Sequence, residues 1–149
     1  MNRLIARQKR AALITVVVTL LWCSSSPDAF ASPQSRHRPA VEEFSFLLKD
    51  FKMDHQGEVN NVNISVRLRY KPNVSDSEYP DFRAVAKDIE TLLSNYPNKT
   101  DYWEIVNKKI TSLVLTKYAV VTKIASEIQV SPSAGVPYQR SSTVTRERT

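Results

Sequence analysis

The stretch DFRAVAKDIETLLSNYPNKTDYWEIVNKKITSLVLTKY, residues 81–118, decides the fold because it holds two helical patterns separated by one break. In its first half, apolar side chains recur at steps of three and four, the spacing of one helix face: Phe82, Val85, Ala86, Ile89, Leu92, Leu93 and Tyr96. Pro97 ends this pattern, since proline lacks an amide hydrogen and disfavours helical angles in the preceding residue. We expect a second helix up to Tyr118, capped by the hydroxyl of Thr100.

Alternation of apolar and polar residues on both sides of this stretch predicts strands. The second strand has the clearest pattern, with Val62, Ile64, Val66, Leu68 and Tyr70 on one face. Turn residues 54–57 join it to the first strand, and 131–135 join the last two strands. The four predicted strands are residues 41–53, 61–70, 121–130 and 138–145. The order β-β-α-α-β-β predicts an α+β domain over residues 41–145, with a four-stranded antiparallel sheet, two helices on one face, and a frayed tail at 146–149.

The N-terminal residues carry the pattern of a secretory signal peptide. Four basic residues precede an apolar run at Ala11–Trp22, and Ala29-Phe30-Ala31 supplies small residues where a signal peptidase cleaves. We expect residues 1–31 to be removed, residues 32–40 to form a flexible leader, and the protein to be exported, periplasmic or secreted. An uncleaved membrane anchor is the alternative, but the run is shorter than the roughly 20 residues that span a bilayer.

Cleavage would change the net charge and the cysteine content of the protein. It would lower the formal net charge from +6 to about +3, which disfavours a nucleic-acid partner because such partners need a concentrated basic face. It would also remove Cys23, the only cysteine, together with any membrane anchor. The exported domain would then be stabilised by its packed core without a disulfide.

Over about Phe44–Thr143, the element order resembles the tunnelling fold, or T-fold, and in particular dihydroneopterin aldolase. Tyr79-Pro80-Asp81-Phe82 loosely matches the family's Tyr-Ala-Asp-type segment at the start of a helix. The segment from Trp103 to Tyr118 aligns without a gap on the next helix and places Glu104 on the family's ligand-anchoring glutamate. The resemblance implies an oligomer that binds a pterin- or purine-like heterocycle between subunits.

Chemistry explains the use of a glutamate at this position. A carboxylate can accept two parallel hydrogen bonds from the ring N–H and the exocyclic amine of a pterin or guanine edge. The positive end of the helix dipole also favours the ionised form of Glu104. The alternative is that Glu104 is an ordinary acidic residue in a first helical turn.

The chain departs from the aldolase pattern where catalysis would occur. The family's lysine between the last two strands is absent from Ser131-Pro132-Ser133-Ala134-Gly135. The two histidines lack a His-x-His spacing, so no metal site and no cofactor are expected. His55 and Tyr79 remain the candidate acid–base residues, although a lone histidine in a turn is more often solvated.

Three functional hypotheses remain open. The preferred one is a heterocycle-binding T-fold protein with Glu104 as anchor and no aldolase chemistry. The second is a pteridine lyase or isomerase in which His55 or Tyr79 replaces the lysine. The third is a non-catalytic structural or interaction domain of the cell envelope. The polar face of the second strand, residues 61–69, further predicts a homo-oligomer of at least four chains, because an uncovered sheet with free edges tends to pair with copies of itself.

Overall fold

The structure is a computed structural model that describes residues 40–149, so the predictions for residues 1–39 lie outside it. A short 3-10 turn, Asp76–Glu78, precedes the first helix. The regular elements are β1 (Glu43–His55), β2 (Glu58–Tyr70), α1 (Phe82–Ser94), α2 (Trp103–Lys117), β3 (Val121–Val130) and β4 (Arg140–Glu147). This order confirms the predicted β-β-α-α-β-β sequence of elements.

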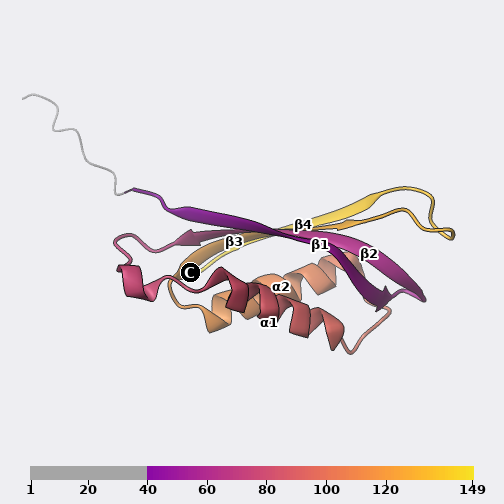
Figure 1. The fold of residues 1–149 in the computed structure, drawn as a ribbon, viewed down its shortest axis with the longest axis horizontal. Coiled ribbons are helices and arrows are strands. Elements are labelled where there is room, and N and C mark those ends of the chain that lie inside the picture. Colours follow the sequence, from indigo (N-terminus) through magenta and orange to yellow (C-terminus); the bar gives the residue numbers. More distant parts are fainter. Residues whose placement is uncertain (1–39) are drawn as a thin grey trace, which may run out of the picture. The chain divides into compact units, whose positions relative to one another are not determined.

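The strands form one antiparallel sheet in the order β1-β2-β3-β4. Both helices cover the same face of this sheet, as Figure 1 shows. Helix α2 packs against β3 and β4, and α1 packs against α2 and β1. The opposite face, called the open face below, is not covered by any element of the described residues. The predicted α+β architecture is therefore confirmed.

The core lies between the sheet and the helices, where alternate residues of each strand meet the apolar stripes of α1 and α2. The alternation predicted for the second strand is confirmed, and fully buried aliphatic side chains each contribute about 1.5–3 kcal/mol through burial. The largest buried aliphatic residues are Ile64, Leu68, Ile89, Ile110, Ile124 and Ile128.

A β-bulge in β1 changes which side chains face the core. Leu48 pairs with Ile64 and Phe51 pairs with Val62, so two residues of β1 oppose the single Asn63. Asp50 occupies the bulge with a φ of 53°, and its amide donates to the Asn63 side chain at 3.0 Å. The bulge shifts the alternation of inward-facing and outward-facing side chains by one residue. As a result, the side chain of His55, at the end of β1, faces the core.

The turn after β1 is shorter than the predicted residues 54–57. It consists of Gln56 and Gly57, with φ values of 54° and 83°, the pattern of a two-residue type I′ hairpin. Glycine adopts this conformation without steric cost. Asp54 and His55 consequently belong to β1, so the expectation that His55 is a solvated turn residue is wrong.

Boundaries later in the chain also differ from the prediction. Helix α2 starts at Trp103 after Tyr102, and the Thr100 hydroxyl donates to the Asn98 side chain at 2.8 Å and does not cap the helix. This bond closes a local turn of the kind that asparagine favours. Strand β4 extends to Glu147, into the tail that was expected to be frayed. The Arg148 amide still donates to the Thr122 carbonyl at 2.7 Å.

A buried asparagine joins α2 to the edge of the sheet. The Asn107 side-chain amide donates to the backbone carbonyls of Ser126 on β3 and Ser142 on β4, at 2.9 and 2.8 Å. Asn107 is fully buried, so both contacts are shielded from water. The periodicity of the second helix did not indicate this contact.

Candidate functional site

Glu104 lies in the first turn of α2, as predicted, and its side chain is exposed. It forms no side-chain hydrogen bond and no ion pair with any residue in the range 40–149. A carboxylate at the positive end of a helix dipole with both oxygens free can accept hydrogen bonds from an external donor. The next residue back, Trp103, is buried and anchors this turn in the core.

His55, a candidate acid–base residue, is instead part of the core. Its side chain is fully buried, and its ring packs against Trp103 with 4.6 Å between ring centroids. Its Nε2 lies 2.8 Å from the backbone carbonyl oxygen of Asp101. A histidine in this position holds α2 against the β1–β2 hairpin but does not face solvent or an open cavity.

Tyr79, the other candidate, lies in an aromatic pocket of about 620 Å³. Its ring meets Tyr70 edge-on at 5.1 Å, and its hydroxyl donates to the Glu42 carboxylate, which raises the pKa of Tyr79 to about 12. At neutral pH the phenol is therefore protonated. The pocket is lined by Val41, Glu42, Glu43, Phe44, Tyr70, Tyr79, Pro80 and Phe82.

Two aromatic residues of this pocket are only partly covered by the rest of the chain. The rings of Phe44 and Phe82 pack on each other with 5.3 Å between their centroids, but 37% and 44% of the two residues' surfaces remain exposed. They stand near the starts of β1 and α1, where the sheet and the helix layer no longer cover each other. Partly exposed aromatic clusters are frequent at binding sites.

Tyr79 and Glu104 lie far apart within one chain. Glu104 follows Trp103, which contacts His55 beside the β1–β2 hairpin, whereas Tyr79 contacts Tyr70 at the other end of β2. Strand β2 has 13 residues. At about 3.3 Å per residue the two ends of the strand are separated by about 40 Å. Both residues could meet one ligand only across an interface between chains.

The described residues show neither a metal-binding cluster nor a membrane-spanning helix. Within residues 40–149, no group of three or more histidine, cysteine, aspartate or glutamate side chains is placed to hold a metal ion. In the same part of the chain, none of the helices has the length and hydropathy needed to cross a bilayer.

Comparison with known proteins gives similarity in structure but not in sequence. No family model and no curated protein matches the chain. A dihydroneopterin aldolase from Burkholderia thailandensis bound to guanine superposes with a TM-score of 0.58 and 13% identity, over 73% of this chain and 93% of the other. A Vibrio cholerae protein named as a candidate dihydroneopterin aldolase superposes with a TM-score of 0.55 and 9% identity, over 70% and 98% of the two chains.

These superpositions cover nearly all of both solved chains, and identities this low show a shared fold and no more. The fold agrees with the resemblance inferred from the order of elements and from the segments around Tyr79 and Glu104. The described part of this chain has a T-fold that resembles dihydroneopterin aldolase.

Proposed function

We propose that this protein binds a pterin- or purine-like heterocycle at an interface between its subunits, with the Glu104 carboxylate as the anchor. The observation that carries the proposal is the free, exposed carboxylate of Glu104 at the start of α2. A T-fold structure similar to this one was determined with bound guanine, which supports a ligand of this class.

The chemistry of the ligand follows from that of the carboxylate. Two oxygens in one plane match two adjacent N–H donors, such as a ring N–H and an exocyclic amine. Guanine, pterins and urate carry N–H groups along one edge of a flat ring. A flat ring also needs an apolar surface to stack on, and the exposed Phe44, Tyr79 and Phe82 offer one.

The aromatic pocket and Glu104 lie at opposite ends of β2, so the proposed site needs two chains. We propose that a neighbouring subunit brings its Tyr79 pocket to the Glu104 end of the first subunit. A homo-oligomer of at least four chains would provide such an interface and would pair the free edges of β1 and β4. The protein would act after export, in the periplasm or outside the cell.

Calorimetric titration of the purified protein with guanine, neopterin and urate tests this proposal. We expect saturable binding of at least one of them and at least about tenfold weaker binding in Glu104→Gln, because one charge-assisted hydrogen-bond pair is lost. Glu90→Gln is the matched control, since Glu90 is a helical glutamate on α1 and should leave the affinity unchanged. Absence of binding, or equal affinity in Glu104→Gln, would refute the proposal.

The second candidate function is a non-catalytic structural or interaction domain of the envelope. It is favoured by the position of Glu104 outside both the Tyr79 pocket and two other cavities, one with Ser45 and Thr143 in its lining and one with Glu43 and Thr145 in its lining. Light scattering separates the two functions. A monomer would leave Glu104 without a second subunit and would favour the interaction domain.

The pteridine lyase or isomerase alternative has less support. The lysine of the related aldolases is absent from 131–135, and the loop instead binds Glu58 through the Ser133 hydroxyl at 2.9 Å. His55 is buried with Nε2 already engaged, and a general acid or base must lie within hydrogen-bond reach of its substrate. Tyr79 is the remaining candidate for such a role.

A further inference from the structure

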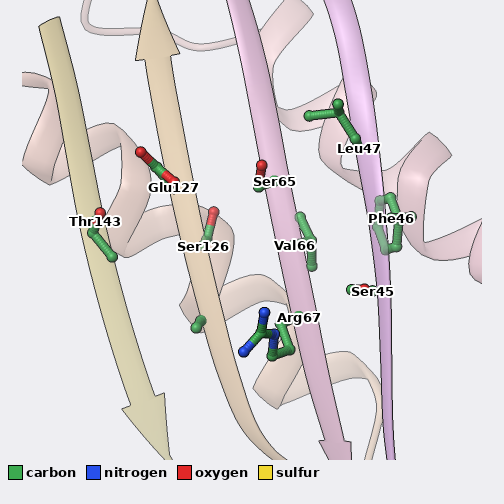
Figure 2. Close-up of a pocket in the computed structure, with 10 residues that line it drawn as sticks. Ser45, Phe46, Leu47, Ser65, Val66, Arg67, Ser126, Glu127 and Thr143 are labelled. Atoms are coloured by element: carbon green, nitrogen blue, oxygen red, sulfur yellow. The ribbon is translucent and has the colours of Figure 1, made fainter.

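The open face of the sheet carries a groove of about 450 Å³ that is separate from both Glu104 and the Tyr79 pocket. Figure 2 shows the residues that line it, contributed by β1, β2, β3 and β4. The groove exists because short side chains occupy neighbouring positions between longer ones. The short residues are Ser45, Ser65, Ala125 and Thr143, and the longer ones are Leu47, Arg67 and Glu127.

Arg67 is the basic group of this groove, and it has no partner within residues 40–149. Its neighbours on the open face are neutralised, since Arg69 pairs with Glu43 at 2.8 Å and Lys123 pairs with Glu147 at 3.4 Å. The Arg67 side chain forms neither an ion pair nor a hydrogen bond with any residue in the described range. A free guanidinium with several N–H donors in one plane is suited to a carboxylate.

Glu127 supplies an acidic group in the same groove. One of its oxygens accepts from Gln129 at 3.1 Å, and the other has no partner among the described residues. Arg67 pairs with Ala125 and Glu127 pairs with Ser65, so Arg67 and Glu127 are diagonal neighbours on adjacent strands. Such positions place Cβ atoms about 7 Å apart, yet no ion pair joins Arg67 and Glu127 within residues 40–149, so both charged groups are available to a small molecule in the groove.

The polar groups between them are also free. The hydroxyls of Ser45, Ser65 and Thr143 make no side-chain hydrogen bond within residues 40–149. A hydroxyl can donate to a carboxylate or accept from an ammonium group, so it fits either end of a dipolar ligand. Leu47, which is 46% exposed, adds an apolar wall.

From these groups we infer that the groove is a binding site for a small zwitterion, namely a free amino acid. Its carboxylate would pair with Arg67 and its ammonium group with Glu127, with Ser65 between them. A simple anion would leave the Glu127 carboxylate next to a like charge, which disfavours it. This site does not depend on the heterocycle site proposed above, because the two share no residue.

Nuclear magnetic resonance titration of the purified protein with glycine and L-alanine tests the inference. We expect saturable shifts of the Ser65 and Thr143 amides, and at least about tenfold weaker binding of acetate and methylammonium, which each carry one charge. Arg67→Gln and Glu127→Gln should each weaken glycine binding by about tenfold or more. Lys52→Gln, which removes a positive charge from the same strand pair outside the groove, should leave the affinity within about twofold.

Three outcomes would overturn the inference. The first is no saturable shift up to about 10 mM amino acid, a concentration that reveals even weak binding. The second is acetate binding as tightly as glycine, which would identify a plain anion site. The third is an equal loss of affinity in Lys52→Gln and Arg67→Gln, which would indicate a general effect of surface charge. Circular dichroism spectra of the variants should match the wild type, because all these side chains are on the surface.

Discussion

The imidazole of His55 packs on the indole of Trp103, with 4.6 Å between the ring centroids and 61° between the ring planes. His55 ends β1 and Trp103 begins α2, so this contact joins the hairpin to the helix that carries Glu104. The Nε2 of His55 lies 2.8 Å from the Asp101 carbonyl oxygen, which can only accept, so Nε2 carries the hydrogen. The ring therefore fixes the position of the turn just before Glu104.

Replacing His55 with alanine should lower the free energy of unfolding by about 2–4 kcal/mol, because it leaves a cavity and removes a buried hydrogen bond. Urea denaturation measures the change. Asp54→Ala is the control, since its ion pair with Lys99 is exposed and should contribute less than about 1 kcal/mol. Nitrogen NMR of the imidazole should show the Nε2–H tautomer, and the Nδ1–H tautomer would contradict the observed contact.

Asp88 joins the two helices, and its contribution to stability should depend on pH. Hydrogen bonds from Lys117 and Tyr118 hold the pKa of Asp88 below its ordinary value. A depressed pKa stabilises the fold above the unfolded pKa of about 4, and the effect is lost as pH falls through the folded pKa. Asp88→Asn should therefore lower the free energy of unfolding by about 1 kcal/mol at pH 7, and the difference should vanish in acid.

Denaturation with urea between pH 2 and 7 checks this dependence on Asp88. Asp76→Asn is a suitable control, because Asp76 has no ion pair and no side-chain hydrogen bond with the described residues. Its effect should be small at every pH. If the free energies of unfolding of wild type and Asp88→Asn differ by the same amount in acid, the pairing with Lys117 is not the source of the difference.

Strand β4 is a free edge of the sheet, and it offers a direct test of assembly. The Arg148 amide points to β3, since it donates to Thr122 at 2.7 Å. Amide directions alternate along a strand, so the Thr145 N–H points away from β3, where a second chain of the proposed oligomer could accept from it. Thr145→Pro removes that donor but keeps the pairing with β3, and proline is tolerated at sheet edges.

Light scattering should therefore show at least four chains for the wild type and for Thr145→Ala, which retains the amide. Thr145→Pro should give smaller species with an unchanged circular dichroism spectrum. If Thr145→Pro and Thr145→Ala assemble equally, β4 is not the edge through which chains associate.

Local patterns predicted the layers of the fold because its regular parts follow their periods without interruption. In β2, every second residue from Val62 to Tyr70 faces the helices, and α1 ends before Pro97 as its sequence indicates. The first strand was predicted less well. The bulge at Asp50 depends on its contacts with the opposing strand, and a single-strand period does not contain that information. His55 was placed in the turn for this reason.

The candidate site was predictable only in part. Glu104 could be placed at a helix start from its local sequence, but its exposure depends on how Trp103 anchors the turn. The exposure of Phe44 and Phe82 depends on where the two layers stop overlapping, which is set by tertiary packing. Arg67 was expected to be polar surface, and its lack of a partner depends on which acidic residues the adjacent strands place opposite it.

The Asn107 amide contacts β3 and β4 together, so it binds the edge strand to the helix layer as well as to its neighbouring strand. Peeling β4 away would break the bond from Asn107 to Ser142 while the bond to Ser126 on β3 remains, at a cost of about 0.5–1.5 kcal/mol beyond the ladder itself. Edge strands usually fray locally, with fast amide hydrogen exchange. Here the Asn107 contact should slow the local opening of β4, so that the strand left open to pairing is also held in register with β3.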